Sequence, residues 1–91
     1  TNGYMEVTIM ITPKGNIHKN PIITFRGLPV EDTEEFIYGL EEVIEKINKT
    51  FSLRSKKQEY NLIDTLKIAC RKYSKEITGK KPFANINLVR I

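Results

Sequence analysis

The sequence predicts an α+β domain with the order β-β-α-α-β, in which two helices pack on one face of a three-stranded sheet. Three observations predict this fold. Apolar and polar residues alternate near the N-terminus and again at the C-terminus, which is typical of half-buried strands. Two apolar stripes with helical spacing lie between these strands. With 91 residues, the chain has room for one domain, which we expect to span 1–91.

The first strand is expected over residues 3–11, where every second side chain is apolar. Residues 12–16 read Thr-Pro-Lys-Gly-Asn, which is typical of a tight turn because proline and glycine favour the required backbone angles. A hairpin partner is therefore expected over residues 17–26. Pro21 cannot donate a backbone hydrogen bond, so part of this second strand should lie at an edge or a bulge.

The first helix is expected over residues 33–49. Asp32 or Thr33 can cap its start, and Glu35 completes a capping box with Asp32. Gly39 weakens the helix by ~1 kcal/mol relative to alanine, and we expect it to allow a neighbouring side chain to approach closely. The apolar stripe consists of Phe36, Leu40, Val43, Ile44, Ile47 and Phe51.

Residues 52–60 are polar and basic and are expected to form a linker between the helices. Asn61 can cap the second helix, and Gly79 can end it. Its apolar stripe consists of Leu62, Leu66, Ala69, Cys70, Tyr73 and Ile77. Residues 83–91 alternate again and are expected to form the last strand, with Ala84, Ile86 and Leu88 on one face.

The net charge of +4 is the sum of three blocks whose sign alternates along the chain. Residues 1–30 carry +2, residues 31–51 carry −5 and residues 52–91 carry +7. Part of the acidic block stabilises the start of the first helix through the helix dipole. Only the second half of the chain therefore resembles a protein that binds polyanions.

No set of residues builds an active site, and we expect this chain alone not to be an enzyme. The single histidine, His18, lies beside the first turn without metal-ligating neighbours. Cys70 lies on an apolar stripe, which indicates an inert core thiol rather than a nucleophile. Glu41, Glu42 and Glu45 could be paired carboxylates, but a solvated helix face explains them without a ligand. No metal or cofactor is therefore expected in this chain.

The second face of the sheet has no helix left to cover it. It carries apolar residues that are candidates for an interface with a partner: Tyr4, Met10, Phe83, Val89 and Ile91. The alternative is an antiparallel face that is half exposed to water and tolerates scattered apolar side chains.

Two basic segments are candidates for RNA binding. Lys56 and Lys57 are expected in the linker, and Lys80 and Lys81 in the turn before the last strand. Lysines near backbone amides of turns bind phosphates, and Arg26 could join them. The alternative is that these lysines solvate loops and complement the end of a helix.

The order of these elements resembles the C-terminal domain of ribonuclease J, most closely that of alphaproteobacterial members. The resemblance rests on the Pro-Lys-Gly-Asn turn at 13–16, Arg-Gly-Leu-Pro at 26–29, Gly-Lys-Lys-Pro at 79–82 and Asn-Leu-Val-Arg-Ile at 87–91. It spans nearly the whole chain, although residues 51–60 are richer in lysine and serine than the family pattern.

The resemblance implies that this chain is one domain of a larger ribonuclease of the metallo-β-lactamase and β-CASP family. Such an enzyme uses zinc in its upstream catalytic domains to hydrolyse RNA from the 5′ end and internally, in RNA processing and decay. The C-terminal domain of the family is non-catalytic and supports assembly into a dimer or tetramer and full activity. Its implied partners are the upstream domains, further copies and RNA, with no membrane. The single cysteine fits a reducing, cytoplasmic location.

Overall fold

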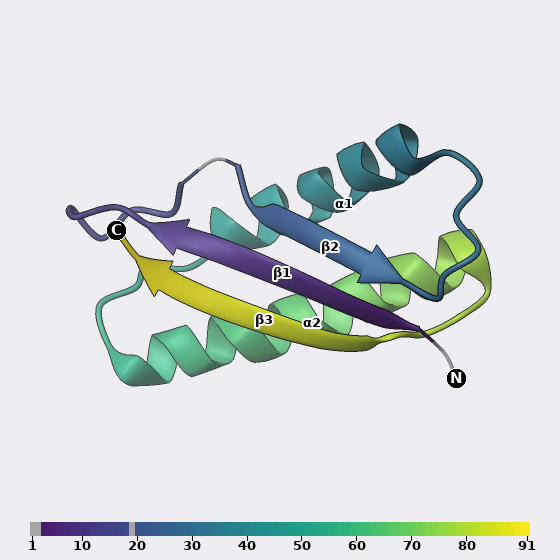
Figure 1. The fold of residues 1–91 in the computed structure, drawn as a ribbon. Helices are drawn as coiled ribbons and strands as arrows, with labels where there is room; N and C mark the ends of the chain where they lie inside the picture. The colour runs from purple at the N-terminus through teal and green to yellow at the C-terminus, as the bar shows by residue number, and fades with distance from the viewer. Residues whose placement is uncertain (1–2, 19) are drawn as a thin grey trace.

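The centre of the fold is a mixed sheet of three strands: β1 (Tyr4–Ile11), β2 (Ile22–Arg26) and β3 (Phe83–Arg90). The computed structural model describes residues 3–18 and 20–91. The strand order is β2-β1-β3, in which β1 is antiparallel to β2 and parallel to β3 (Figure 1). The first and last strands of the chain are therefore neighbours, and both β2 and β3 are edge strands.

Two helices cover one face of this sheet (Figure 1): α1 (Thr33–Asn48) and α2 (Lys56–Thr78). Asp32 caps α1 by accepting a hydrogen bond from the backbone amide of Glu35 at 3.1 Å, as the capping pattern predicts. Gly79 ends α2 in the left-handed conformation with φ of 80°, as expected. The predicted α+β fold with the order β-β-α-α-β is confirmed.

The second strand is shorter than predicted. Instead of spanning residues 17–26, it begins at Ile22, directly after Pro21. Ile17 makes only an isolated bridge to Ile11. Because proline has no backbone N–H, the ladder cannot continue through it, and only the segment beyond Pro21 pairs regularly.

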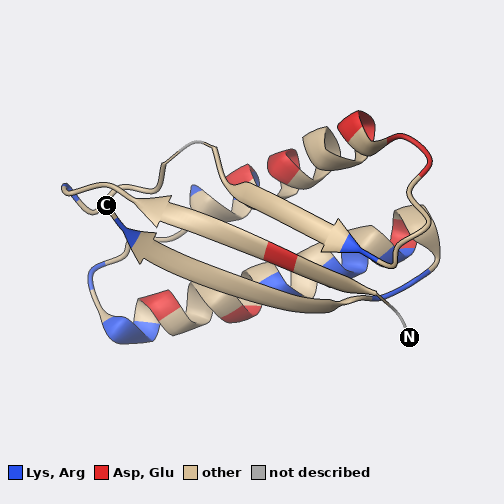
Figure 2. Ribbon diagram, in the orientation of Figure 1, with Lys and Arg blue, Asp and Glu red and all other residues tan. Residues whose placement is uncertain are grey.

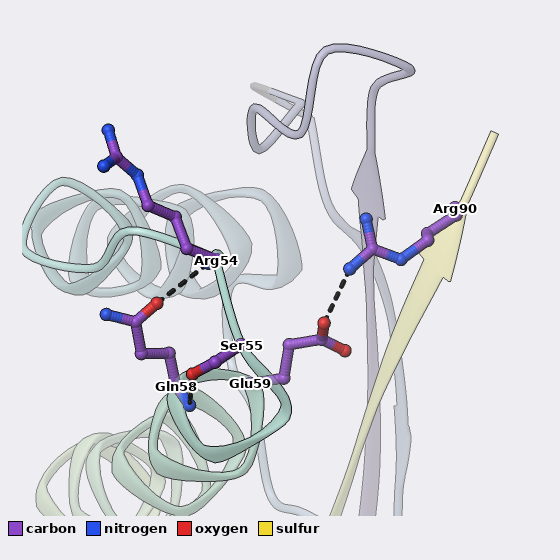
Figure 3. A network of polar contacts seen from close by, with 5 residues as sticks. All are labelled: Arg54, Ser55, Gln58, Glu59 and Arg90. Carbon is purple, nitrogen blue, oxygen red and sulfur yellow. Dashed lines mark hydrogen bonds and ion pairs between the residues drawn. The ribbon is translucent and has the colours of Figure 1, made fainter.

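The second helix is longer than predicted, and the expected cap at Asn61 is wrong. Ser55 caps α2 instead, since its Oγ accepts a hydrogen bond from the amide of Gln58 at 3.2 Å. The side chain of Gln58 in turn accepts a hydrogen bond from the amide of Arg54 at 2.8 Å (Figure 3). The polar residues that suggested a linker are good helix formers, so the helix begins at Lys56.

The core lies between the sheet and the helices and is formed by this chain's own residues. The alternating apolar residues of β1 are completely buried, as predicted. Met5, Val7 and Ile9 form one core cluster with residues of both helices: Phe36, Leu40 and Ile44 of α1 and Leu62, Leu66 and Cys70 of α2. The prediction for Ile77 is wrong, because its side chain is 58% exposed. Ser74 takes a buried position one turn earlier, where its hydroxyl donates a hydrogen bond to the carbonyl of Cys70 at 2.9 Å.

The helices meet at Gly39, as the sequence predicts. A Cβ atom at this position would lie 2.2 Å from the Tyr73 hydroxyl oxygen. That hydroxyl donates a hydrogen bond of 2.9 Å to the carbonyl of Phe36, and the two rings are 5.3 Å apart. The glycine thus makes room for a tyrosine that fastens α2 to α1.

Candidate interaction surface

The face of the sheet opposite the helices is not covered by any of the residues that the structure describes (Figure 1). The strand register places side chains from all three strands on this open face. They are Tyr4, Glu6, Thr8 and Met10 of β1, Ile22, Thr24 and Arg26 of β2, and Phe83, Asn85, Asn87 and Val89 of β3.

A polar network crosses the middle of the open face. Glu6 accepts hydrogen bonds from the Tyr4 hydroxyl at 3.0 Å and from the Asn85 amide at 3.2 Å. Asn85 also donates to Asn87 at 3.4 Å, and Asn87 donates to Thr8 at 3.5 Å. The bonds from Asn85 and Tyr4 lower the pKa of Glu6 below its usual value. This network was not predicted. Its residues nevertheless occupy those alternate positions of the first and last strands that face away from the helices.

The network divides the predicted interface residues into two groups. At one end, the rings of Tyr4 and Phe83 are stacked with centroids 5.8 Å apart, and Phe83 is 63% exposed. At the other end, Met10 and Val89 are register neighbours, and Ile91 follows directly after β3. Tyr4 and Met10 are six positions apart along β1, which corresponds to roughly 20 Å. We call these groups the aromatic end and the aliphatic end.

The outer edge of β3 has unpaired backbone groups. The amide of Phe83 donates to Gly3 and that of Ile91 donates to Ile11, at 3.0 and 2.9 Å, so odd-numbered residues point their N–H and C=O groups toward β1. In a parallel ladder, the even-numbered residues Ala84, Ile86 and Leu88 then point theirs outward. Within residues 3–18 and 20–91, no hydrogen bond joins these outward groups to another part of the chain.

The two edge strands of the sheet differ in length and composition. β2 has five residues and begins directly after Pro21, both features that discourage pairing with another strand. β3 has eight residues and carries neither a proline nor a charge before Arg90. Arg90 itself is held by Glu59 of α2, with 2.6 Å between the guanidinium nitrogen and the carboxylate oxygen (Figure 3). Ala84 and Ile86, whose backbone groups point toward the outer edge of β3, are only 1% and 5% exposed, so little of this edge is accessible to a further strand.

The predicted RNA-binding residues do not form one patch. Arg26 is paired with Tyr4, and Lys80 and Lys81 precede Phe83, so these three residues lie near the aromatic end. Lys56 and Lys57 lie in the first turn of α2 rather than in a linker, so that prediction is wrong. The 23 residues of α2 span roughly 35 Å and separate the two lysine pairs. Figure 2 shows basic residues at both ends of this helix.

The remaining candidate residues are placed in structural roles. The backbone of His18 donates to Met10 at 2.7 Å, and its Nδ1 accepts from the amide of Asn20 at 3.2 Å. Burial raises the pKa of the Cys70 thiol to about 12, so it carries no thiolate at neutral pH. Among residues 3–18 and 20–91, no three His, Cys, Asp or Glu side chains are grouped to hold a metal ion. Nor does any helix in that part of the chain have the length and apolar character needed to cross a membrane.

Comparison with known protein families identifies a relationship. A model of the ribonuclease J C-terminal domain family matches residues 1–90, which is nearly the whole chain. None of the curated proteins that were compared with the chain matches it.

Proposed function

Because the chain belongs to the ribonuclease J C-terminal domain family, we propose that it is a non-catalytic assembly domain of a ribonuclease. In this proposal, RNA hydrolysis and the zinc that supports it belong to other domains of the enzyme. The present domain holds copies of the enzyme together. The observation that carries the proposal is the exposed aliphatic end of the open sheet face.

The aliphatic end has the chemical character of an association surface. Val89 is 44% exposed and Ile91 is 59% exposed, although both belong to residue types that fold into cores. A half-solvated sheet face tolerates single apolar residues. Here they are grouped with Met10 at one end of the open sheet face. A partner that covers this end gains hydrophobic burial.

Sedimentation velocity of the 91-residue chain over a concentration series tests this proposal. We expect a concentration-dependent dimer, and we expect Val89→Glu to shift the equilibrium to monomer because a carboxylate would be desolvated in the interface. Ile68→Glu is the matched control, since Ile68 is a 67% exposed aliphatic residue of α2. A chain that is monomeric at every concentration, or a dimer that Val89→Glu leaves intact, would contradict the proposal.

The aromatic end favours RNA binding as a second candidate function. Tyr4 and Phe83 are stacked on an open sheet, and Arg26, Lys80 and Lys81 lie close by. Aromatic rings that stack on bases, flanked by cations that contact phosphates, are typical of single-stranded RNA sites. This candidate uses only one of the two predicted basic segments.

Fluorescence anisotropy with a single-stranded RNA tests the second candidate. Binding should weaken as salt rises, because phosphate contacts release counterions. Phe83→Ala should weaken binding, since stacking contributes roughly 1–3 kcal/mol per base. Lys56→Ala, which changes a lysine at the far end of α2, should leave binding within about twofold. An absence of binding at low salt, or equal losses in both variants, would rule out this site.

A further inference from the structure

We propose that the hollow at the aromatic end of the open sheet face binds a guanine base of a single-stranded RNA, with the Glu6 carboxylate as the group that recognises the base. This inference rests on RNA binding as the second candidate function and names the base that the site prefers. The hollow is lined by residues of β1 and β2, namely Tyr4, Glu6, Thr24, Phe25 and Arg26. Its volume of about 570 Å³ lies within the range of about 300–1,000 Å³ that is typical of small-molecule sites.

The strand register arranges two rows of side chains across this part of the face. In the first row, Tyr4 lies between Arg26 of β2 and Phe83 of β3. In the second row, Glu6 lies beside Asn85. Successive side chains on one face of a strand are about 7 Å apart, so a base that contacts the first row reaches the second row with its edge.

The Tyr4 ring offers a surface for stacking beside the carboxylate. Phe83 stacks on one face of this ring, with centroids 5.8 Å apart and planes inclined by 16°. The opposite face is turned toward β2, on the side where the hollow lies. The Tyr4 hydroxyl donates to Glu6 Oε2 at 3.0 Å, so a base stacked on the ring has one edge next to the carboxylate. Proteins commonly hold single-stranded RNA by such stacking of bases on aromatic rings.

Glu6 has the charge and the acceptor capacity to recognise a base. The hydrogen bonds from Asn85 and Tyr4 lower its pKa, so the carboxylate is ionised at neutral pH. Both bonds end on Oε2, whereas a carboxylate offers about four acceptor positions on its two oxygens, so Oε1 can accept further bonds. Within the described residues, no ion pair joins Glu6 to Arg26 or to another cation.

Guanine is the base whose Watson–Crick edge matches an ionised carboxylate. It presents two adjacent donors, N1–H and the N2 amino group. Adenine and cytosine each place a ring-nitrogen acceptor beside their amino group, and uracil flanks its N3–H with two carbonyl oxygens. Because a carboxylate only accepts hydrogen bonds, it repels these neighbouring lone pairs and favours guanine.

A nucleotide combines the features that this end of the face requires. Its base has a flat surface for Tyr4 and a donor edge for Glu6, and its phosphate complements the exposed guanidinium of Arg26. Lys80 and Lys81 are also exposed and lie just before β3, so they add positive charge for the neighbouring phosphates of an RNA strand. The charges of the site thus match single-stranded RNA.

Fluorescence anisotropy with a set of short oligouridylates tests the preference. Each labelled RNA carries one central guanosine, adenosine, cytidine or uridine. We expect the guanosine RNA to bind about tenfold more tightly than the other three, since a well-placed pair of base contacts discriminates by roughly this factor. Inosine, which lacks the N2 amino group, should reduce the preference in place of guanosine, whereas a guanosine analogue that lacks N7 should keep it.

Glu6→Gln tests the carboxylate itself. It removes the charge but keeps an acceptor oxygen for Tyr4 and Asn85, and it should bring the four RNAs to within about twofold of one another. Circular dichroism checks that the variant is folded. Glu42→Gln is the matched control, since it removes the same charge from an exposed position of α1 and should keep the preference. Arg26→Gln should weaken all four RNAs alike and lower the slope of log affinity against log salt by roughly 0.7.

The outcomes separate this inference from the broader candidate function. Salt-dependent binding without a preference for guanosine would overturn guanine recognition but leave RNA binding standing. A preference that survives Glu6→Gln, or that depends on N7 rather than on the N2 amino group, would assign the recognition to another group and also overturn the inference. An absence of binding at low salt would overturn both.

Discussion

Replacing Gly39 with alanine tests how the two helices are fastened together. In an isolated helix, this change stabilises by ~1 kcal/mol, because alanine has the higher helix propensity. Here the new Cβ would lie 2.2 Å from the Tyr73 hydroxyl oxygen and 3.0 Å from the ring carbon that carries it. The tyrosine hydroxyl must therefore move by more than about 1 Å before it reaches ordinary contact distance.

That movement has two costs. It breaks the 2.9 Å hydrogen bond from Tyr73 to the Phe36 carbonyl, with a net loss of ~1 kcal/mol. It also overpacks the contact between the helices, at ~1–3 kcal/mol. After the gain in helix propensity is subtracted, we expect Gly39→Ala to lower the free energy of unfolding by ~1–3 kcal/mol. For a domain of this size, each 1 kcal/mol lowers the melting temperature by about 4–8 °C.

Urea unfolding followed by circular dichroism measures this effect in a double-mutant cycle with Tyr73→Phe. Removing the hydroxyl removes the shortest contact, so Gly39→Ala should be nearly neutral in that background. If Gly39→Ala instead stabilises the wild-type chain, or is equally destabilising in both backgrounds, the proposed contact between the helices is refuted.

Three further predictions concern single residues. Ser55→Ala should lower the free energy of unfolding by ~1 kcal/mol in urea unfolding, since it removes the cap of α2; a neutral result would contradict the helix start. Asn85→Leu should raise the pKa of Glu6, as measured by NMR titration, because it removes the hydrogen bond that contributes most to lowering it. With its folded pKa below the unfolded value, Glu6 stabilises the fold above its usual pKa, and this contribution is lost as pH falls through the folded pKa. The Cys70 thiol should react with a thiol reagent at pH 8 only at the rate of unfolding, and rapid labelling of the native chain would contradict its burial.

Much of the fold could be predicted because its signals are local. The alternation in β1, the cap at Asp32 and the stop at Gly79 each depend on neighbours within a few residues. The errors occurred where two local signals compete. Polar residues at 55–60 suit both a loop and the first turns of a helix, and the cap at Ser55 decides between them.

The candidate site was harder to predict because it depends on the strand order. Once β1 and β3 are neighbours, Tyr4 stacks on Phe83, and Glu6 bonds to Asn85. These contacts join opposite ends of the chain, and no local pattern shows which strands are adjacent. The sequence predicted which residues face outward, but not that they divide into two ends.

NMR chemical shifts of the open sheet face as a function of protein concentration test the central claim most directly. The amides of Met10, Val89 and Ile91 report on the aliphatic end, and those of Tyr4 and Phe83 report on the aromatic end. If the chain assembles through the aliphatic end, the shifts of the first group change with concentration, whereas those of the second group change little. Shifts of the aliphatic end that stay constant at every concentration would contradict the account.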